Sequence, residues 1–574
     1  MRHCVPFRAV FFLWSLWMYV WVGPASAQTS TAKTPTSTQK NAPKLKLTPQ
    51  QERGLRLLRS AQAEAAALQP DMRTFVLMQV ADGYQKVDTS KVDALLKEAF
   101  TASLSIEGIA PRSDDPERVC PMMEGCGIKL WLQRDILSAI RSLTDAQALL
   151  LRAEPQVQRQ VTEFLIVRYV TKKDFERAKE LIVSLASQGD YPYEAAMELM
   201  LALPPSERLD TFAQALNAYQ QQGASQSYGS GFVGMPGMVM RFWHDVPTAL
   251  AVDAIDQILE NAKDVSAGPN NVRLTYSGNA GTVALSSQYQ YRLFQLLPVL
   301  QELDKPKADS LLRDNPDLQA LLGRFPEGLP ALRPDYRLHR PKEGEAPIYH
   351  MSVSSGDAPP TAINALAVQA QQEIQRRQEQ IAVESETDPK QAVADAMSLP
   401  EVTPSTGLPG AGSSPRATAL LRIAKKLGKK NPSVTKDALA EARKSLSQGS
   451  LRVQASSLND AAEEYLEIGD EDGAQKTVKE ALQVAEKLYA KDSDSDDPNR
   501  VFKGGWPSMN QWRRCVQITT RFSPTAAEAI IAGIRDPEIA TFEKVYFANA
   551  LLGVPPATMS VGERHKSEGM FSLF

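Results

Sequence analysis

The sequence predicts an almost entirely α-helical protein built from stacked helix pairs. From Pro49 onward, Ala- and Leu-rich stretches of about 12 to 20 residues carry apolar side chains at three- and four-residue steps, which is the helical period. Short breaks marked by Pro, Gly, Asp or Asn separate these stretches. Several stretches also resemble one another, and internal similarity of this kind is typical of repeat proteins.

Residues 1–27 have the organisation of a secretory signal peptide. Arg2 and Arg8 form a short basic region, an apolar run extends from Ala9 to Val22, and small residues precede a cleavage point after Ala27. The run is shorter than the roughly 20 apolar residues that a membrane span needs. We therefore expect an exported protein, periplasmic or secreted after cleavage near Ala27. An uncleaved membrane anchor is the alternative.

The mature chain has no second apolar run of that kind, so we expect no membrane span in it. Loss of Arg2 and Arg8 with the leader takes the formal net charge from −3 to −5. This charge is small for 574 residues, and it provides no global basic field to attract nucleic acid or anionic lipid. Nucleic acid is therefore not an expected partner.

Composition divides the mature chain into segments. Residues 28–48 contain few apolar side chains and cannot bury a core, so they predict a disordered tether. Helical patterning then predicts an N-terminal helical-repeat domain over 49–325 and a C-terminal one over 361–555. Dense prolines and weak periodicity predict a linker over 326–360, and residues 556–574 predict a flexible tail.

The segment from Val265 to Leu285 interrupts the helical pattern. It contains the alternating run Val272-Arg273-Leu274-Thr275-Tyr276, followed by Ser-Gly-Asn-Ala-Gly. Alternation followed by glycine-containing turn residues is typical of a β-hairpin. The sequence predicts either a small β-hairpin inserted between helices or an irregular surface loop.

The clearest repeat unit spans Leu458 to Glu486. Its defining residues are Ala462 and Tyr465 on a first helix, Gly469-Asp470 at the turn, and Ala474, Val478 and Ala481 on a second helix. The small residues allow close approach of the two helices, and Tyr465 is expected to fill the groove between them. Gly469 can adopt the left-handed conformation that ends a helix.

Weaker copies of helix pairs occur elsewhere, and they agree in turn position as well as in apolar phase. The matching segments are Thr162–Leu185 with Leu458–Glu486, Leu77–Ala99 with Leu420–Ala442, and Pro389–Val402 with Pro524–Ile539. Ala-rich helices resemble one another by composition alone, so agreement at the turns is the stronger evidence. One helix pair cannot bury its apolar face by itself, and stacked neighbours are expected to supply the core.

The spacing in Leu458–Glu486 resembles the tetratricopeptide repeat, although the usual tryptophan, the glycine on the first helix and the closing proline are missing. The resemblance implies an all-α fold, an α-solenoid of antiparallel helix pairs, in a protein of an exported bacterial type. It also implies a surface that binds a protein or peptide partner. It carries over no catalytic residue.

No familiar catalytic motif is present in the sequence. The HExxH metalloprotease pattern, the GxSxG elbow and the P-loop are absent. Gly229 to Gly234 fits GxGxxG, but the residues before it are predicted to be helical, whereas a dinucleotide loop needs a preceding strand. We expect no catalytic residue, no cofactor and no metal site. An enzyme whose site is assembled from residues distant in sequence is the alternative.

Two aromatic segments are candidates for ligand or partner contacts. Arg241, Trp243 and His244 follow a glycine-rich stretch, and a Gly-Gly pair precedes Trp506, with Trp512 further on. Exposed aromatic rings suit recognition of a peptide or a sugar. Packing of the rings in the core is the preferred interpretation, because aromatic residues dominate core burial as readily as interfaces.

Three cysteines remain after the leader. Cys120 and Cys126 bracket a short loop, and an exported protein can keep a disulfide there. A disulfide between them is preferred to two free thiols, and no histidine lies near enough to complete a zinc site. Cys515 lies in a helical stretch, where a buried core thiol is the simpler prediction.

These observations predict an exported helical-repeat scaffold that mediates protein–protein or peptide binding in the cell envelope without catalysis. The alternative is a carbohydrate- or cell-wall-binding protein with weak hydrolase activity, for which Trp243, Trp506 and Trp512 would stack on glycan.

Overall fold

A computed structural model describes most of the chain. The described residues are 47–107, 125–222, 234–267, 272–278, 281–332, 349–355, 362–402, 414–446, 449–494 and 502–554. The predicted leader, nearly all of the tether and the tail at 556–574 lie outside these residues, as do Cys120 and Gly229. Within the described residues, no helix combines the length and apolar character that a membrane span requires.

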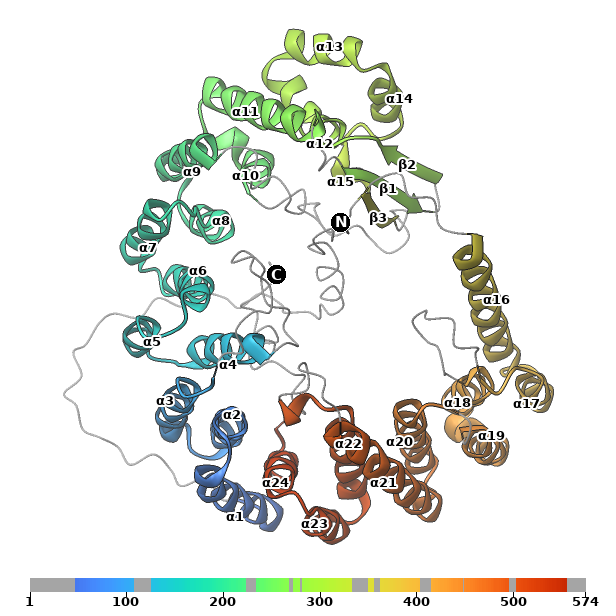
Figure 1. Ribbon diagram of the computed structural model, residues 1–574. Helices are drawn as coiled ribbons and strands as arrows, with labels where there is room; N and C mark the ends of the chain where they lie inside the picture. Colours follow the sequence, from blue (N-terminus) through green and yellow to red (C-terminus); the bar gives the residue numbers. More distant parts are fainter. Residues whose placement is uncertain are drawn as a thin grey trace, which may run out of the picture. The chain divides into compact units, whose positions relative to one another are not determined.

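The described chain is predominantly α-helical, as predicted, and consecutive helices pack against each other in pairs (Figure 1). The chain forms two compact units. Unit 1 contains the described residues between Arg159 and Pro359, and unit 2 contains those before and after this segment. The units therefore do not follow the order of the sequence, because unit 2 is built from both ends of the described chain.

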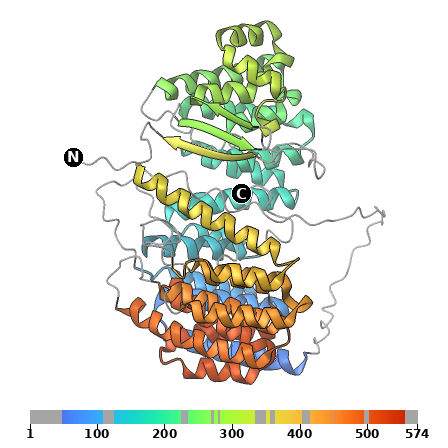
Figure 2. The ribbon, with the colours of Figure 1, turned by 90° about the vertical axis from the view of Figure 1, so that its right-hand side faces the viewer.

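The first half of unit 2 consists of α1 (Pro49–Glu64), α2 (Pro70–Val87), α3 (Val92–Ser103), α4 (Gly125–Ala139) and α5 (Leu143–Leu150). The second half consists of α16 (Ala362–Glu384), α17 (Pro389–Met397), α18 (Pro415–Leu427), α19 (Pro432–Ser445), α20 (Leu451–Glu467), α21 (Glu471–Ser493), the short 3-10 helix η10 (Lys503–Gly505), α22 (Pro507–Phe522), α23 (Pro524–Gly533) and α24 (Pro537–Leu551). In Figure 2 the helices of the second half lie alongside one another in successive layers.

Unit 1 is helical with one small sheet. Its helices are α6 (Pro155–Thr171, which begins at the boundary), α7 (Phe175–Ser187), α8 (Tyr193–Ala202), α9 (Leu209–Gln222), α10 (Met235–Phe242), the 3-10 helix η5 (Trp243–Asp245), α11 (Thr248–Ala267), α12 (Gln288–Leu303), α13 (Lys305–Asp314), α14 (Pro316–Arg324) and α15 (Leu329–Leu332). Its strands are β1 (Val272–Gly278), β2 (Gly281–Leu285) and β3 (Tyr349–Ser355).

Of the two structures predicted for Val265 to Leu285, the β-hairpin is the one present: β1 and β2 pair antiparallel with Leu274 opposite Leu285. The strand β3 pairs antiparallel with the other edge of β1, so the sheet order is β2-β1-β3. Both α15 and β3 lie inside the segment predicted as a linker, 326–360. Weak helical periodicity alone does not distinguish a linker from a strand whose partner lies far upstream in the sequence.

The helix pair α20–α21 has the features predicted for the clearest repeat unit. The small residues at the helix contact are fully buried, and Tyr465 is 5% exposed. Gly469 at the turn has a positive φ of 79°. The backbone N–H of Asp470 donates to the carbonyl of Tyr465 (2.8 Å), and the Asp470 side chain then caps α21 by accepting from the N–H of Gly473 (2.9 Å).

The pair α6–α7 closes with the same turn. The N–H of Asp174 donates to the carbonyl of Tyr169 (3.0 Å), and the Asp174 side chain accepts from the N–H of Arg177 (3.3 Å). Lys173 stands where the other unit has Gly469, and it also has a positive φ, 61°. The two turns therefore share their backbone conformation, their cap and their tyrosine, and they occur in different units.

We expect Lys173→Gly to stabilise unit 1 by about 0.5 to 1 kcal/mol. Relief of the left-handed conformation is worth about 1 to 2 kcal/mol, and the greater conformational entropy of glycine in the unfolded chain offsets part of this gain. The reciprocal change, Gly469→Ala, should destabilise unit 2 by about 1 kcal/mol. Urea denaturation of each variant measures both effects. A stability loss in Lys173→Gly would contradict the argument.

The other matched segments also adopt corresponding structures. In α2–α3 and in α18–α19, the matched apolar positions are buried except for the half-buried Leu421, and the two helices of each pair pack against each other. In α17 and α23, a proline occupies the first turn, and the preceding Asp388 or Ser523 caps the helix through its side chain. Similarity in sequence therefore corresponds to similarity in helix start and buried face.

Both ends of the described chain meet in unit 2. The helix α24 packs against α1 and α2, and buries Phe542, Tyr546 and Phe547. An ion pair between Lys544 of α24 and Glu64 of α1 reinforces this contact, and a second one between Arg53 of α1 and Glu528 (2.6 Å) joins α1 to α23. The domain boundaries predicted from composition, 49–325 and 361–555, thus differ from the observed units, because composition does not report which helices far apart in sequence share a core.

Candidate functional site

A shallow groove of about 700 Å³ lies on unit 1, between the first half of α11 and the turn that joins α12 to α13. It is lined by Thr248, Ala249, Val252, Asp253 and Asp256 of α11, and by Leu303, Asp304, Lys305 and Pro306 of the turn. Its apolar part consists of exposed and half-buried side chains rather than core residues. The groove follows η5 directly in the chain, and η5 begins at the predicted contact residue Trp243.

The charges in the groove are unevenly distributed. Lys307 forms an ion pair with Asp256, and it bridges the α11 side to the α13 side. Asp304 caps α13 by accepting from the N–H of Lys307 (3.1 Å). Asp253 is exposed on the α11 side, whereas Lys305 is exposed on the opposite side. The groove therefore presents a carboxylate on one wall and an ammonium group on the other.

The predicted contact residues of unit 1 differ in accessibility. Arg241 and Trp243 are half-buried and His244 is exposed, with the rings of Trp243 and His244 3.3 Å apart between centroids. The intervening Phe242 is 1% exposed and anchors the segment in the core. The structure therefore brings Trp243 and His244 together, and it leaves His244 available to solvent.

The predicted contact residues of unit 2 are buried. Trp506 is 8% exposed and Trp512 is 6% exposed, and both pack on Tyr489 with ring centroids 5.8 and 5.3 Å apart. Little of either indole face is available for stacking on a sugar. The burial favours the packing interpretation of these two residues.

A charged cluster surrounds Lys503 beside these aromatic rings. The Lys503 ammonium contacts Asp536 (2.8 Å) and Glu538 (2.6 Å), and the Tyr489 hydroxyl donates to Asp536 (2.9 Å). Burial lowers the pKa of Lys503, but its hydrogen bonds to the two carboxylates outweigh this effect and raise it. Asp536 also caps α24. The cluster thus fixes the start of α24 to η10 and α21.

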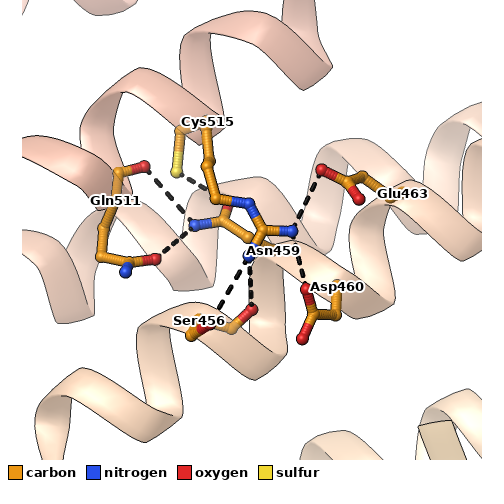
Figure 3. A network of polar contacts seen from close by, with 7 residues as sticks. Ser456, Asn459, Asp460, Glu463, Gln511 and Cys515 are labelled. Atoms are coloured by element: carbon orange, nitrogen blue, oxygen red, sulfur yellow. Dashed lines mark hydrogen bonds and ion pairs between the residues drawn. The ribbon is translucent and has the colours of Figure 1, made fainter. Parts of the chain in front are cut away.

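A second polar network joins α20 to α22 (Figure 3). The fully buried Asn459 donates through Nδ2 to the carbonyl (3.4 Å) and to Oε1 (2.9 Å) of Gln511. The Cys515 thiol donates to Oδ1 of Asn459 (3.2 Å). Arg514 contacts Asp460 (2.7 Å) and Glu463 (3.0 Å) at the edge of the network. These contacts satisfy the buried side-chain amide of Asn459 and the thiol of Cys515.

Cys515 is a fully buried free thiol, as predicted. Burial raises its pKa to about 12. Because the thiolate is the reactive form, we expect Cys515 to resist iodoacetamide in the native protein at about pH 8 and to react once the protein is unfolded in urea. Mass spectrometry of the Cys515 peptide measures this difference. Equal labelling rates in the two states would contradict the assigned burial.

Glu543 of α24 is the most unusual group in unit 2. It is fully buried, and neither of its carboxylate oxygens has a hydrogen-bond partner among the described residues. Burial raises its pKa to about 8, against the opposing effect of Arg513. The other ionisable groups that interact with this region are Asp82 of α2, Cys515 of α22 and Tyr546 of α24. Glu543 is therefore predominantly protonated at neutral pH.

Asn459 and Glu543 belong to no sequence motif, although their positions in the helical period are informative. Asn459 occupies the apolar stripe of α20 between Ala455 and Ala462, and Glu543 occupies that of α24 between Ile539 and Phe547. A polar residue in phase with an apolar stripe predicts a buried polar group. The described residues contain no group of three or more His, Cys, Asp or Glu side chains placed to hold a metal ion.

Cys126 lies in the first turn of α4. Its partner in the predicted disulfide, Cys120, lies outside the described residues, and the pairing stays a prediction. The GxGxxG segment also lies outside them except for Gly234, which precedes α10.

Comparison with known proteins provides no family for this chain. No family model matches it, and no curated protein matches it. Among solved structures, the crystal structure of Ton1535 from Thermococcus onnurineus NA1 is matched over 87% of this chain and 99% of that chain, with 10% sequence identity and a TM-score of 0.16. At this TM-score the match demonstrates no common fold, and we transfer no function from it.

Proposed function

We propose that the protein is an exported helical-repeat scaffold, an α-solenoid of tetratricopeptide-like pairs, that binds a protein or peptide partner in the cell envelope. The supporting observation is the turn shared by α6–α7 and α20–α21. The two turns have the same tyrosine, the same left-handed residue and the same capping aspartate. Recurrence of one helix pair in both units is expected for a chain that extends a surface by repetition.

The distribution of chemical groups also favours binding over catalysis. The charged clusters around Lys503 and Arg514 hold helices of unit 2 together through neutralised pairs. The groove on unit 1, in contrast, combines exposed apolar side chains with two charges on opposite walls. Such a combination suits a polypeptide segment more than a small substrate.

Glycan binding, the alternative function, has less support in the side chains. Of the three tryptophans that motivate it, Trp506 and Trp512 are buried, and Trp243 is half-buried against His244. Sugar recognition through stacking needs an exposed ring face. Peptide or protein binding is therefore the function we propose.

Selection of short random peptides displayed on phage, with the immobilised mature chain as target, tests the proposal. We expect enrichment of related sequences that bind the folded protein and lose binding when it is unfolded in urea. Enrichment no greater than on an uncoated surface would overturn the proposal.

A further inference from the structure

The groove on unit 1 has a chemistry that restricts what can occupy it. Its apolar surface comes from Ala249 and Val252 on α11 and from Leu303 and Pro306 across the groove. Ala249 and Pro306 are exposed, and the other two are half-buried. Exposed apolar side chains collected in one concave place are typical of surfaces that another molecule covers.

The charged side chains of the groove indicate which kind of partner it can bind. Two of the three acidic side chains have contacts within the protein, because Asp256 pairs with Lys307 and Asp304 caps α13. Asp253 forms no ion pair within the described part of the chain, and it is exposed beside Val252. A cation placed against Asp253 would have an apolar surface next to it.

We propose that this groove binds an extended peptide segment that carries a lysine or arginine next to an apolar side chain. The basic group pairs with Asp253, and the neighbouring apolar side chain lies against Val252 and Leu303. The assignment rests on the proposed peptide-binding function and specifies the peptide chemistry and the site. Lys305 on the opposite wall disfavours a second basic group there, so the groove also orients the segment.

The probe is a short fluorescein-labelled peptide of alternating lysine and leucine, compared with its glutamate–leucine counterpart by fluorescence anisotropy. We expect the full mature chain to bind the lysine peptide more tightly. Asp253→Lys should weaken it about tenfold, which corresponds to about 1.4 kcal/mol, and Lys305→Glu should tighten it. Asp264→Lys, an exposed change on the same helix away from the groove, is the matched control and should leave binding unchanged.

A second variant tests the location independently of charge. Ala249→Trp fills the groove from an exposed position and should weaken both peptides. Circular dichroism confirms that each variant is folded. If peptides selected on phage bind equally well to wild type, Asp253→Lys and Ala249→Trp, the groove assignment is wrong while peptide binding stands. If no peptide binds any form, the proposed function itself is overturned.

Discussion

Replacing Glu543 by glutamine is expected to remove a pH dependence from the stability of unit 2. The pKa of this carboxyl is raised to about 8 in the folded chain from an ordinary value of 4.5. The folded state therefore holds the proton more tightly than the unfolded state does. The stabilisation that comes from proton binding at Glu543 is complete below pH 4.5 and is lost progressively as the pH rises through 8.

The expected magnitude is large for one residue. At about pH 7 the proton linkage costs wild type roughly 3 kcal/mol relative to acid conditions, and Glu543→Gln should be more stable by about that amount, because the amide keeps the shape without ionising. Urea denaturation across this pH range, followed by tryptophan fluorescence, measures the effect. Of the four tryptophans after the leader, three lie in unit 2.

The exposed Glu486 on α21 provides the matched control, and Glu486→Gln should leave the pH dependence of wild type unchanged. The argument fails if wild type and Glu543→Gln lose stability in parallel as the pH rises.

The second large effect is expected at Gly83, where α2 meets α1 and α24. A Cβ at this position would lie 2.5 Å from Oδ1 of Asn549 and 2.7 Å from Cδ2 of Leu58. Asn549 donates to the buried carbonyl of Gln79 (2.9 Å), so it cannot move away without breaking that bond. Gly83→Ala should therefore destabilise unit 2 by about 2 to 3 kcal/mol, despite the better helix propensity of alanine.

Two further glycines calibrate this prediction. Gly54→Ala on α1 would place its Cβ 2.9 Å from the backbone oxygen of Ala548, so a destabilisation of similar origin is expected. Gly533→Ala on α23 would meet no atom within 4 Å, and its effect should be neutral or stabilising by up to about 1 kcal/mol. Thermal unfolding compares the three. Equal effects at Gly83 and Gly533 would show that close packing is not the cause.

Local features of the fold were predictable because their causes are local. The turn at Gly469, the buried faces of α20 and α21, and the β1–β2 hairpin follow from residues close together in sequence. The burial of Cys515 was predictable for the same reason, since it lies in the apolar stripe of α22. Periodicity and turn chemistry carry this information without knowledge of the rest of the chain.

Features that depend on distant segments were not predictable in this way. The strand β3 forms by pairing with β1, a distant segment that lies earlier in the sequence. The two halves of unit 2 are joined by the packing of α1 and α2 against α24. Among the site residues, Asp253 belongs to no sequence motif, and only its neighbours in the groove make it a candidate contact residue. Glu543 is distinguished by burial on all sides, to which α2, α22 and α24 contribute.

The contact between α1 and α24 has a consequence for the order of events during synthesis. The carboxylate of Glu64 pairs with Lys544, and the N–H of Gln69 donates to Glu538 (3.1 Å), so these early residues find their partners only when α24 has been made. A chain that leaves the ribosome from its N-terminus keeps the faces of α1 and α2 that contact α24 uncovered until then, while the described part of unit 1, a continuous stretch of sequence, can fold first. A chaperone that holds the early helices would therefore act over nearly the whole length of translation.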